Sequence, residues 1–328
     1  MSGRVLICDA DRYTTDVFEL LSSEFTVFKS AANDRKALSD EIVSNRIEVL
    51  FCNLATKIDA LLLNDASELK FVVSPTTGLS HVDLEYLKER RITCVYLGQI
   101  KSEISSVFAT AELAWALLLA VARKMSLAAM STQSGDWRRE NFFGVSLSNK
   151  VIGIIGFGRL GRRVAEYALS FGMTVLAYDS DQKVFADLDK SIVQCKLEHL
   201  ILNSDFVSIH IPLNDETENL MSRERIDLLR DGAVLINTSR GEVVDEGALV
   251  DAVKSGKLFG VGADVLRNEN DNNFDASKSD LVQAANNGYN VVVTPHIGGW
   301  TDDAVRVTRR VIAEEFMKIY NENKSATT

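Results

Sequence analysis

Residues 151–179 constrain the fold of this chain more than any other segment. They read VIGIIGFGRLGRRVAEYALSFGMTVLAYD, an apolar strand pattern followed by a glycine-rich turn, an amphipathic helix, a second apolar strand pattern and one carboxylate. Strand, helix and strand in this order predict a βαβ unit of a parallel sheet. The GxGxxG turn is the arrangement that dinucleotide-binding units use. The segment therefore predicts a Rossmann-type unit that binds a dinucleotide.

Each glycine of the turn has a geometric task. Gly156 permits a tight exit from the strand, Gly158 lets backbone N–H groups approach a pyrophosphate, and Gly161 lets the helix pack close to the sheet. The diphosphate would then lie at the partial positive charge of the helix N-terminus.

Asp179 ends the second strand pattern, where a carboxylate can accept hydrogen bonds from both hydroxyls of a ribose. It would repel a 2′-phosphate, and Ser180 and Asp181 follow it instead of an arginine. Lys183 is the nearest cation and is weak evidence in the other direction. NAD is therefore favoured over NADP, and an ordinary turn or N-cap role for Asp179 is the alternative.

Length and composition predict a soluble globular protein with two domains. The chain has 328 residues, of which 46% are hydrophobic and 25% are charged. Its net charge of −10 argues against nucleic acid or an anionic membrane as the main partner. No apolar run reaches transmembrane length, and the N-terminus lacks the apolar core of a signal peptide, so we expect a cytoplasmic protein.

The four cysteines are predicted to be reduced core residues. They are widely spaced, and each lies in an apolar, strand-like run: Cys8, Cys52, Cys94 and Cys195. Since their spacing fits no metal site, we predict no bound metal.

Strand and helix patterns alternate along the whole chain. Strand patterns of the first hundred residues are RVLIC, FTVF, EVLFC, KFVV and ITCVYL, with amphipathic segments at 11–23, 34–46 and 83–90. After Asp179 the strand patterns are SIVQC, DFVSIHI, GAVLINTS, FGVGAD and NVVVT. This alternation predicts parallel sheets covered by helices on both faces.

Two further helices are expected. One long helical pattern runs from about Ile104 to Ser131 and precedes an aromatic loop that includes Trp137 and Phe143. The other is amphipathic and runs from Thr301, a plausible N-cap, to about Tyr320.

The only three prolines, Pro75, Pro212 and Pro295, each follow a strand pattern. Proline cannot donate to a central ladder, so each marks a strand end. Ligands of parallel α/β sheets bind outside the carboxyl ends of the strands, so these turns either line a cleft or simply terminate strands.

His296 is the best candidate for a general acid and base among the four histidines. It follows a strand and a proline and precedes two glycines, which let a ligand approach the backbone. His210 follows a strand, where it would line the adenosine side of a dinucleotide site or pack as a structural residue. His81 favours capping or packing near a helix start, and His199 favours a surface or packing role.

The motifs GFGRLG…D, NTSRGEVVDEGAL, GADVLRNE and VVTPHIGGWT occur in this order. Together they resemble the D-isomer-specific 2-hydroxyacid dehydrogenases, over essentially the entire chain and most densely from Asn141 to Thr301. The resemblance implies an α/β protein with two doubly wound parallel-sheet domains. A Rossmann NAD-binding domain (102–296) would be inserted into a flavodoxin-like substrate domain (1–101 and 297–328). A dimerisation arm at about 104–149 would make the protein a homodimer, and an ordinary interdomain linker is the alternative for this segment.

The resemblance also implies a catalytic triad of Arg240, Glu269 and His296. A planar guanidinium at Arg240 can grip a carboxylate and polarise the adjacent carbonyl. Glu269 would stabilise the imidazolium of His296, which would exchange a proton with the substrate oxygen.

Binding roles are implied for two further groups of residues. Those along the cofactor, beside the three turn glycines, are Arg159, Leu160, Asp179, Thr238, Ser239, Asp264, Gly298 and Gly299. Those of the loop whose backbone N–H groups would hold the substrate carboxylate are Thr77, Gly78 and Leu79. The chain departs from the family at Asn270, where a proline usually follows the triad glutamate, and in the substrate loop SPTTGLSH, which replaces a GxGxD pattern.

The expected function is hydride transfer between NAD(H) and a small D-2-hydroxy or 2-keto acid. Candidate substrates are 3-phosphoglycerate, glycerate with hydroxypyruvate or glyoxylate, and D-lactate-like acids. Only Lys57 is a cation between Asn53 and Ile58, so charge does not support phosphate recognition. No additional regulatory domain is expected. The alternative of another class is an NAD-sensing corepressor-like binding protein.

Overall fold

The structure is a computed structural model that describes residues 3–100, 102–186, 188–271 and 273–326. The chain divides into two compact units. Unit 1 comprises Met1–Val107, Asn270–Asn272 and Thr301–Thr328, and unit 2 comprises Phe108–Glu269 and Asn273–Trp300. These limits fall a few residues beyond the expected boundaries after residues 101 and 296, and the sequence carries no sign of the short excursion at Asn270.

Unit 1 contains a parallel sheet of five strands in the order β2-β1-β3-β4-β5. The strands are β1 (Gly3–Ile7), β2 (Phe25–Lys29), β3 (Val49–Phe51), β4 (Phe71–Ser74) and β5 (Thr93–Tyr96). All five coincide with apolar runs of the sequence. This strand order is that of the flavodoxin-like folds, in which the order reverses between β1 and β3.

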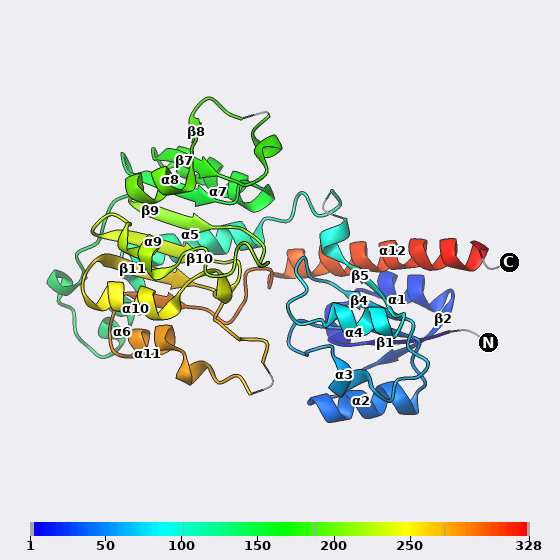
Figure 1. Cartoon of the computed structure of the whole chain (residues 1–328). Helices are drawn as coiled ribbons and strands as arrows, with labels where there is room; N and C mark the ends of the chain where they lie inside the picture. Colours follow the sequence, from blue (N-terminus) through cyan, green and yellow to red (C-terminus); the bar gives the residue numbers. More distant parts are fainter. Residues whose placement is uncertain (1–2, 101, 187, 272, 327–328) are drawn as a thin grey trace. The chain divides into compact units, whose positions relative to one another are not determined.

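Helices cover both faces of this sheet, because side chains along each strand alternate between the faces. Val5 and Ile7 of β1 pack in one hydrophobic cluster with α1 (Thr15–Ser22) and α12 (Asp302–Ala326). Leu6 packs in the other cluster with α2 (Arg35–Ser44), α3 (Ala60–Leu63) and α4 (Leu84–Glu89). Figure 1 shows α12, in red, running along the same unit as the blue N-terminal strands.

The last helix of the chain completes the core of the first unit. The hydroxyl of Thr301 accepts a hydrogen bond from the backbone N–H of Ala304 at 3.3 Å, which confirms the predicted N-cap. Phe316 is fully buried, and its ring centroid lies 5.5 Å from those of Phe51 and Phe71. One face of the sheet in unit 1 is therefore covered partly by α12, although this helix is remote from the strands in the sequence.

Unit 2 contains a parallel sheet of seven strands in the order β12-β11-β10-β9-β6-β7-β8. The strands are β6 (Val151–Ile155), β7 (Thr174–Tyr178), β8 (Ile192–Gln194), β9 (Phe206–Ile209), β10 (Ala233–Asn237), β11 (Leu258–Ala263) and β12 (Val291–Val293). The order reverses between β6 and β9, which is the Rossmann switch point.

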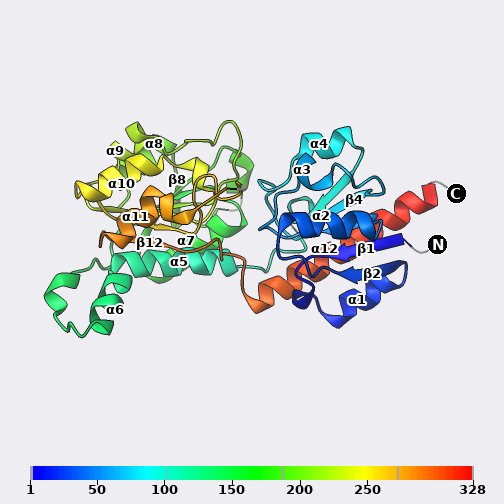
Figure 2. The ribbon, with the colours of Figure 1, turned by 90° about the horizontal axis from the view of Figure 1, so that it is seen from below.

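Two layers of helices enclose the second sheet. One face packs against α5 (Ala109–Ala122) and α7 (Arg159–Ser170). The other packs against α8 (Leu197–Asn203), α9 (Arg223–Asp227), α10 (Glu246–Lys254) and α11 (Asp280–Asn286). Figure 2 shows α5 extended along unit 2, with α6 (Met125–Gln133) following it. The prediction of two doubly wound parallel α/β domains is confirmed.

The prediction of one long helix over residues 104–131 is wrong. The chain forms α5 and α6, which are bent by 65° at Arg123 and Lys124. Lys124 has φ of 48°, and this left-handed residue interrupts the helical hydrogen-bond ladder. No glycine or proline near it indicates the break in the sequence. Among the described residues no single helix is long and apolar enough to cross a membrane, although α5 and α6 meet the length and composition criteria as a bent pair.

Candidate active site

The glycine-rich turn between β6 and α7 leaves room at the helix N-terminus. Gly156 has φ of +93°, and a Cβ there would lie 2.5 Å from the carbonyl oxygen of His210. At Gly158 a Cβ would meet no atom within 4 Å. At Gly161 a Cβ would collide with the carbonyl of Gly156, so the helix packs directly on the turn. The turn therefore fits a diphosphate against the open backbone of Gly158 and the start of α7.

Asp179 is fixed to this turn by the backbone. Its Oδ2 accepts a hydrogen bond from the N–H of Phe157 at 2.7 Å, and its Oδ1 accepts one from Asp181 at 2.9 Å. Each carboxylate oxygen has a second lone pair that can accept from a ribose hydroxyl. The carboxylate thus stands beside the turn, where a dinucleotide would need it.

The two residues after Gly158 differ in environment. Leu160 is half-buried and packs against the hydrophobic cluster beneath α7. Arg159 is half-buried, and this burial lowers the pKa of its guanidinium, which nevertheless stays charged at neutral pH.

His210 lies directly after β9, close to the switch point. Its Nε2 is 2.8 Å from the hydroxyl of Ser208, and burial lowers the pKa of His210 to about 4. The imidazole is therefore neutral at physiological pH and contributes a polar surface without a charge. Its backbone carbonyl also closes on Gly156, so the residue shapes the turn whether or not its ring meets a cofactor.

Asn237, which sequence reasoning missed, sets the shape of the loop after β10. Its Oδ1 accepts hydrogen bonds from the N–H and hydroxyl of Ser239 at 3.0 and 2.7 Å, and its Nδ2 donates to the carbonyl of Arg240 at 2.9 Å. An asparagine as the last residue of a strand, before Thr-Ser-Arg, was the available signal. Through these bonds Asn237 holds Thr238, Ser239 and Arg240 in one fixed turn.

Arg240 and Thr238 are polar groups held at the buried edge of this turn. Burial lowers the pKa of Arg240, while the carboxylates of Glu269 and Glu242 act in the opposite direction, and the guanidinium remains charged. The buried hydroxyl of Thr238 makes no hydrogen bond within the described residues. A buried polar atom of this kind fits the polar surface of a bound cofactor.

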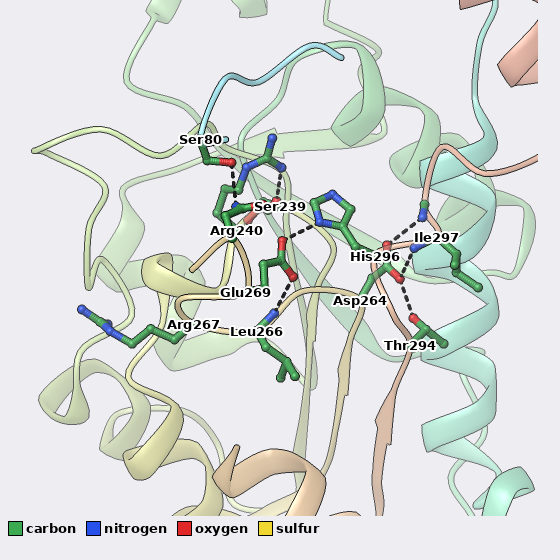
Figure 3. Close-up of polar contacts among 12 residues, drawn as sticks. Ser80, Ser239, Arg240, Asp264, Leu266, Arg267, Glu269, Thr294, His296 and Ile297 are labelled. Carbon is green, nitrogen blue, oxygen red and sulfur yellow. Dashed lines mark hydrogen bonds and ion pairs between the residues drawn. The ribbon is translucent and has the colours of Figure 1, made fainter. Parts of the chain in front are cut away.

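His296 and Glu269 form a close pair. The Nδ1 of His296 lies 2.5 Å from Oε1 of Glu269, and Oε2 of the same carboxylate accepts from the N–H of Leu266 at 3.1 Å (Figure 3). The two side chains are 23% and 13% exposed. Because the carboxylate engages Nδ1, it orients the imidazole so that Nε2 is the nitrogen that can exchange a proton with a ligand.

The backbone of His296 has an uncommon conformation for a residue with a side chain. Its φ is +53°, in the left-handed region. The N–H of His296 donates to the carbonyls of Asp264 at 2.8 Å and Thr294 at 3.0 Å, and these bonds hold the conformation. Such residues cluster at functional sites, where the surrounding structure over-determines them.

Asp264 anchors the loop that carries His296. Asp264 is 1% exposed, and its carboxylate accepts hydrogen bonds from the hydroxyl of Thr294 at 2.6 Å and from the N–H groups of Ile297 at 2.9 Å and Gly298 at 2.7 Å. Burial raises the pKa of Asp264, although these three bonds act in the opposite direction. A Cβ at Gly298 would lie 3.0 Å from the carboxylate, whereas one at Gly299 would meet open space.

The three predicted triad residues come from the carboxyl ends of three neighbouring strands. Arg240 follows β10, Glu269 follows β11 and His296 follows β12, and these strands are adjacent in the sheet. Figure 3 shows Arg240, Glu269 and His296 gathered at one place. Parallel strands end at the same edge, so residues remote in the sequence meet there.

The predicted substrate loop lies in unit 1, after β4. The hydroxyl of Thr76 donates to the carbonyl of Gly78 at 2.7 Å and lies 2.8 Å from the hydroxyl of Ser74. Thr77 is exposed, whereas Gly78 and Leu79 are half-buried. Thr76, which the sequence did not single out, therefore fixes the shape of this loop.

His81 is a packing residue in the same unit. It is fully buried, and its Nε2 lies 3.3 Å from the hydroxyl of Ser74. It stands three residues before α4, whose N-cap is Asp83. His199, on α8, is exposed, so neither histidine resembles a catalytic group.

Comparison with known proteins agrees with this geometry. Residues 115–298 match the family described as D-isomer specific 2-hydroxyacid dehydrogenase, NAD binding domain. The chain is 33% identical to hydroxypyruvate reductase of Thermotoga maritima, over 95% of this chain and 98% of that protein. It is 34% identical to glyoxylate reductase of Thermococcus litoralis, over 83% of this chain and 80% of that protein.

A solved structure has the same fold over nearly its whole length. The D-lactate dehydrogenase of Aquifex aeolicus, in complex with NAD and lactic acid, superimposes with a TM-score of 0.76 at 27% identity. The match covers 98% of this chain and 96% of that one. Family match, identity and fold agree, and the chain belongs to the D-isomer-specific 2-hydroxyacid dehydrogenases, which are NAD-dependent oxidoreductases.

Proposed function

We propose that this protein reduces a small 2-keto acid to its D-2-hydroxy acid with NADH and catalyses the reverse oxidation with NAD. The observation that carries the proposal is the His296–Glu269 pair, at the same sheet edge as Arg240. A carbonyl reduction needs a proton donor and a cation that holds the acid, and these three groups supply both.

The residues divide the work as follows. The Arg240 guanidinium grips the substrate carboxylate and polarises the adjacent carbonyl. Bound NADH supplies the hydride to the carbonyl carbon. His296 gives the proton of its Nε2 to the carbonyl oxygen, and in the oxidation it takes that proton back. Glu269 holds the imidazolium in place before the proton transfer. After the transfer the imidazole ring is neutral and still lies beside the carboxylate of Glu269.

We assign the cofactor to unit 2 and the substrate loop to unit 1. The residues proposed to line the cofactor are Gly156, Gly158, Arg159, Leu160, Gly161, Asp179, His210, Thr238, Ser239, Asp264, Gly298 and Gly299. The backbone N–H groups of Thr77, Gly78 and Leu79 would hold the carboxylate of the acid as an anion nest.

Asp179 is expected to set the preference for NAD. Replacing it with glycine and Ser180 with arginine (D179G/S180R) should change the ratio of kcat/KM for NADPH to that for NADH by about 10- to 100-fold, since charge-assisted bonds to the ribose are lost and a cation for the phosphate is gained. Steady-state assays with both coenzymes measure this ratio. S180R alone, which keeps the carboxylate, is the matched control, and an unchanged ratio in the double variant would show that Asp179 does not meet the ribose.

Among candidate substrates we favour unphosphorylated acids such as hydroxypyruvate and glyoxylate. Two relatives that are similar to this chain over most of its length are named as reductases of these two compounds. Lys57, the only cation between Asn53 and Ile58, has its Nζ 3.8 Å from a carboxylate oxygen of Asp271 and is partly compensated there. Phosphate recognition, as for 3-phosphoglycerate, would need more positive charge in this loop.

A panel of 2-keto acids assayed with NADH tests the proposal. We expect the highest kcat/KM for glyoxylate or hydroxypyruvate, a lower value for pyruvate and the lowest for phosphohydroxypyruvate. Absence of NADH oxidation with every acid, together with intact NADH binding, would instead support the corepressor-like binding protein.

We also propose that the protein is a cytoplasmic homodimer. The segment 125–143 of unit 2 exposes large apolar side chains, namely Met125, Met130, Trp137 and Phe143, and Trp137 and Phe143 are 86% and 87% exposed. Exposed apolar groups concentrated in one segment are typical of an interface. All four cysteines are free thiols, which fits a reducing compartment.

The dimer predicts a mass of twice 36.2 kDa in light scattering. Replacing Trp137 and Phe143 with glutamate should halve that mass, because both charges would have to be buried on association. Leu61, which is 78% exposed on α3 of unit 1, provides the matched control L61E. A wild-type protein that elutes and scatters as a monomer would contradict the proposal.

A further inference from the structure

Arg309, on the inner side of α12 in unit 1, is a buried charge that the proposed chemistry does not use. Its side chain is 7% exposed, and its neighbours Ile312 and Ala313 on the helix are fully buried in the core. The guanidinium carbon lies 5.4 Å from the centroid of the Tyr13 ring, and Nη2 lies 4.0 Å from a carboxylate oxygen of Asp9. Arginine is rarely buried in this way unless it is paired, because desolvating the charge is costly.

Asp9, which lies beside Arg309, stands at the switch point of the sheet in unit 1. Asp9 comes shortly after β1, Asn53 comes shortly after β3, and the strand order reverses between these two neighbours. Nδ2 of Asn53 donates to Asp9 at 3.1 Å. In open α/β sheets this crevice, outside the carboxyl ends of the strands, is where ligands bind.

Asn53 connects Asp9 to the loop that follows β3. Its Oδ1 accepts a hydrogen bond from the N–H of Thr56 at 3.1 Å, which closes a turn over residues 53–56. Arg309, Asp9, Asn53 and Thr56 thus form a chain of polar contacts that begins in the core and ends in a loop at the rim of the sheet.

The far end of this loop is tied to the predicted substrate loop. The N–H of Ile58 donates to the carbonyl of His81 at 2.7 Å, and the N–H of Asp83 donates to the carbonyl of Ile58 at 2.8 Å. Residues 53–58 are therefore held between the Asp9–Asn53 contact and the segment that follows Thr77, Gly78 and Leu79.

We propose that Arg309 is a positioning residue for the substrate: through Asp9 and Asn53 it holds loop 53–58, which is bonded to the segment after Thr77, Gly78 and Leu79, in the shape that binding of the acid requires. The inference rests on the proposed function. An apolar side chain would satisfy the core at this position at least as well as a guanidinium, since buried ion pairs add little stability over apolar residues. What an apolar residue cannot do is orient Asp9, and through it the loop.

The test compares R309M and R309K with R310M. Arg310 is the next residue of the same helix, but its side chain is 62% exposed and pairs with Glu314 and Asp16. With the keto acid that the wild type prefers, R309M should raise KM about 10- to 100-fold, because small misplacements of binding groups cost this much. The Kd of NADH should stay unchanged, since that site belongs to unit 2. R309K should fall between R309M and the wild type, and R310M should match the wild type.

A second readout does not depend on turnover. Amide hydrogen exchange in peptides covering residues 53–58 should become faster in R309M and in D9N, and not in R310M, because the N–H of Thr56 depends on this chain of contacts. The effects of R309M and D9N should not add in the double variant, as expected for residues of one network.

Two outcomes would overturn the inference. One is a KM and an exchange rate of loop 53–58 in R309M and R309K that equal those of R310M, even if the melting temperature falls, because Arg309 would then only stabilise the core. If R309M does not fold, unchanged exchange in D9N overturns the inference equally. A wild type without keto-acid reduction would contradict the proposed function, and the exchange experiment would still decide the role of Arg309.

Discussion

Replacing His296 with alanine should lower kcat by about 10²- to 10⁴-fold, the usual contribution of a positioned general acid. The proton for the carbonyl oxygen would then have to come from water, while the hydride donor stays in place. The turn at Gly158 and the carboxylate of Asp179 are contributed by other loops of unit 2. The Kd of NADH, measured by fluorescence titration, should therefore change little.

Two comparisons make this result interpretable. His199 is exposed on α8, and H199A should leave kcat unchanged. E269Q should lower kcat less than H296A does, because a neutral amide can still accept at one oxygen but no longer stabilises the imidazolium. If H296A loses NADH binding together with turnover, His296 has a structural role and the proposed proton donor is wrong.

Replacing Arg240 with methionine should lower kcat/KM about 30- to 4,000-fold. This corresponds to an activation free energy that is higher by about 2–5 kcal/mol, which is the cost of removing one partner of a buried charge pair. The substrate carboxylate would lose its bidentate partner, and the polarised carbonyl would lose a nearby positive charge. R240K should recover only part of the loss, because an ammonium group lacks the planar fork of a guanidinium. Steady-state kinetics with glyoxylate or hydroxypyruvate measure both effects.

Arg267 provides the matched control for Arg240. It lies in a neighbouring loop, but its side chain points away from Glu269 and His296 and bonds to Glu218 at 3.0 Å and Asn219 at 2.8 Å (Figure 3). R267M should keep kcat/KM near the wild-type value. Equal losses of kcat/KM in R240M and R267M would mean that only the overall positive charge at this sheet edge affects the reaction. Arg240 would then not bind the substrate carboxylate directly.

The strands and the dinucleotide unit could be predicted from the sequence because their signals are local. Short apolar runs of the sequence coincide with the strands of both units, and several of these runs are bounded by glycine or proline. The GxGxxG turn and Asp179 belong to one continuous segment of 29 residues, from Val151 to Asp179. Period and turn chemistry within such a segment determine its structure with little help from the rest of the chain.

Other features depend on contacts that the sequence does not display. The break between α5 and α6 occurs at Lys124, whose left-handed backbone carries no glycine to announce it. Asn237 and Thr76 looked like ordinary polar residues, and only the folded loops show that their side chains bond to the backbone that presents Arg240 and Gly78. The passage of Asn270 into unit 1, where it donates to Ser80 at 3.1 Å, likewise follows from tertiary packing alone.

The dependence of unit 1 on α12 has a consequence for synthesis on the ribosome. The strands of unit 1 emerge before unit 2, yet Ile312 and Phe316, which pack on one face of their sheet, are translated after unit 2. The central unit has all its strands by Val293 and can close its core while the N-terminal sheet is still half bare. Newly made chains therefore expose the apolar face of β1 and β3 until α12 has been translated, and this is the stage at which chaperones or self-association would compete with folding.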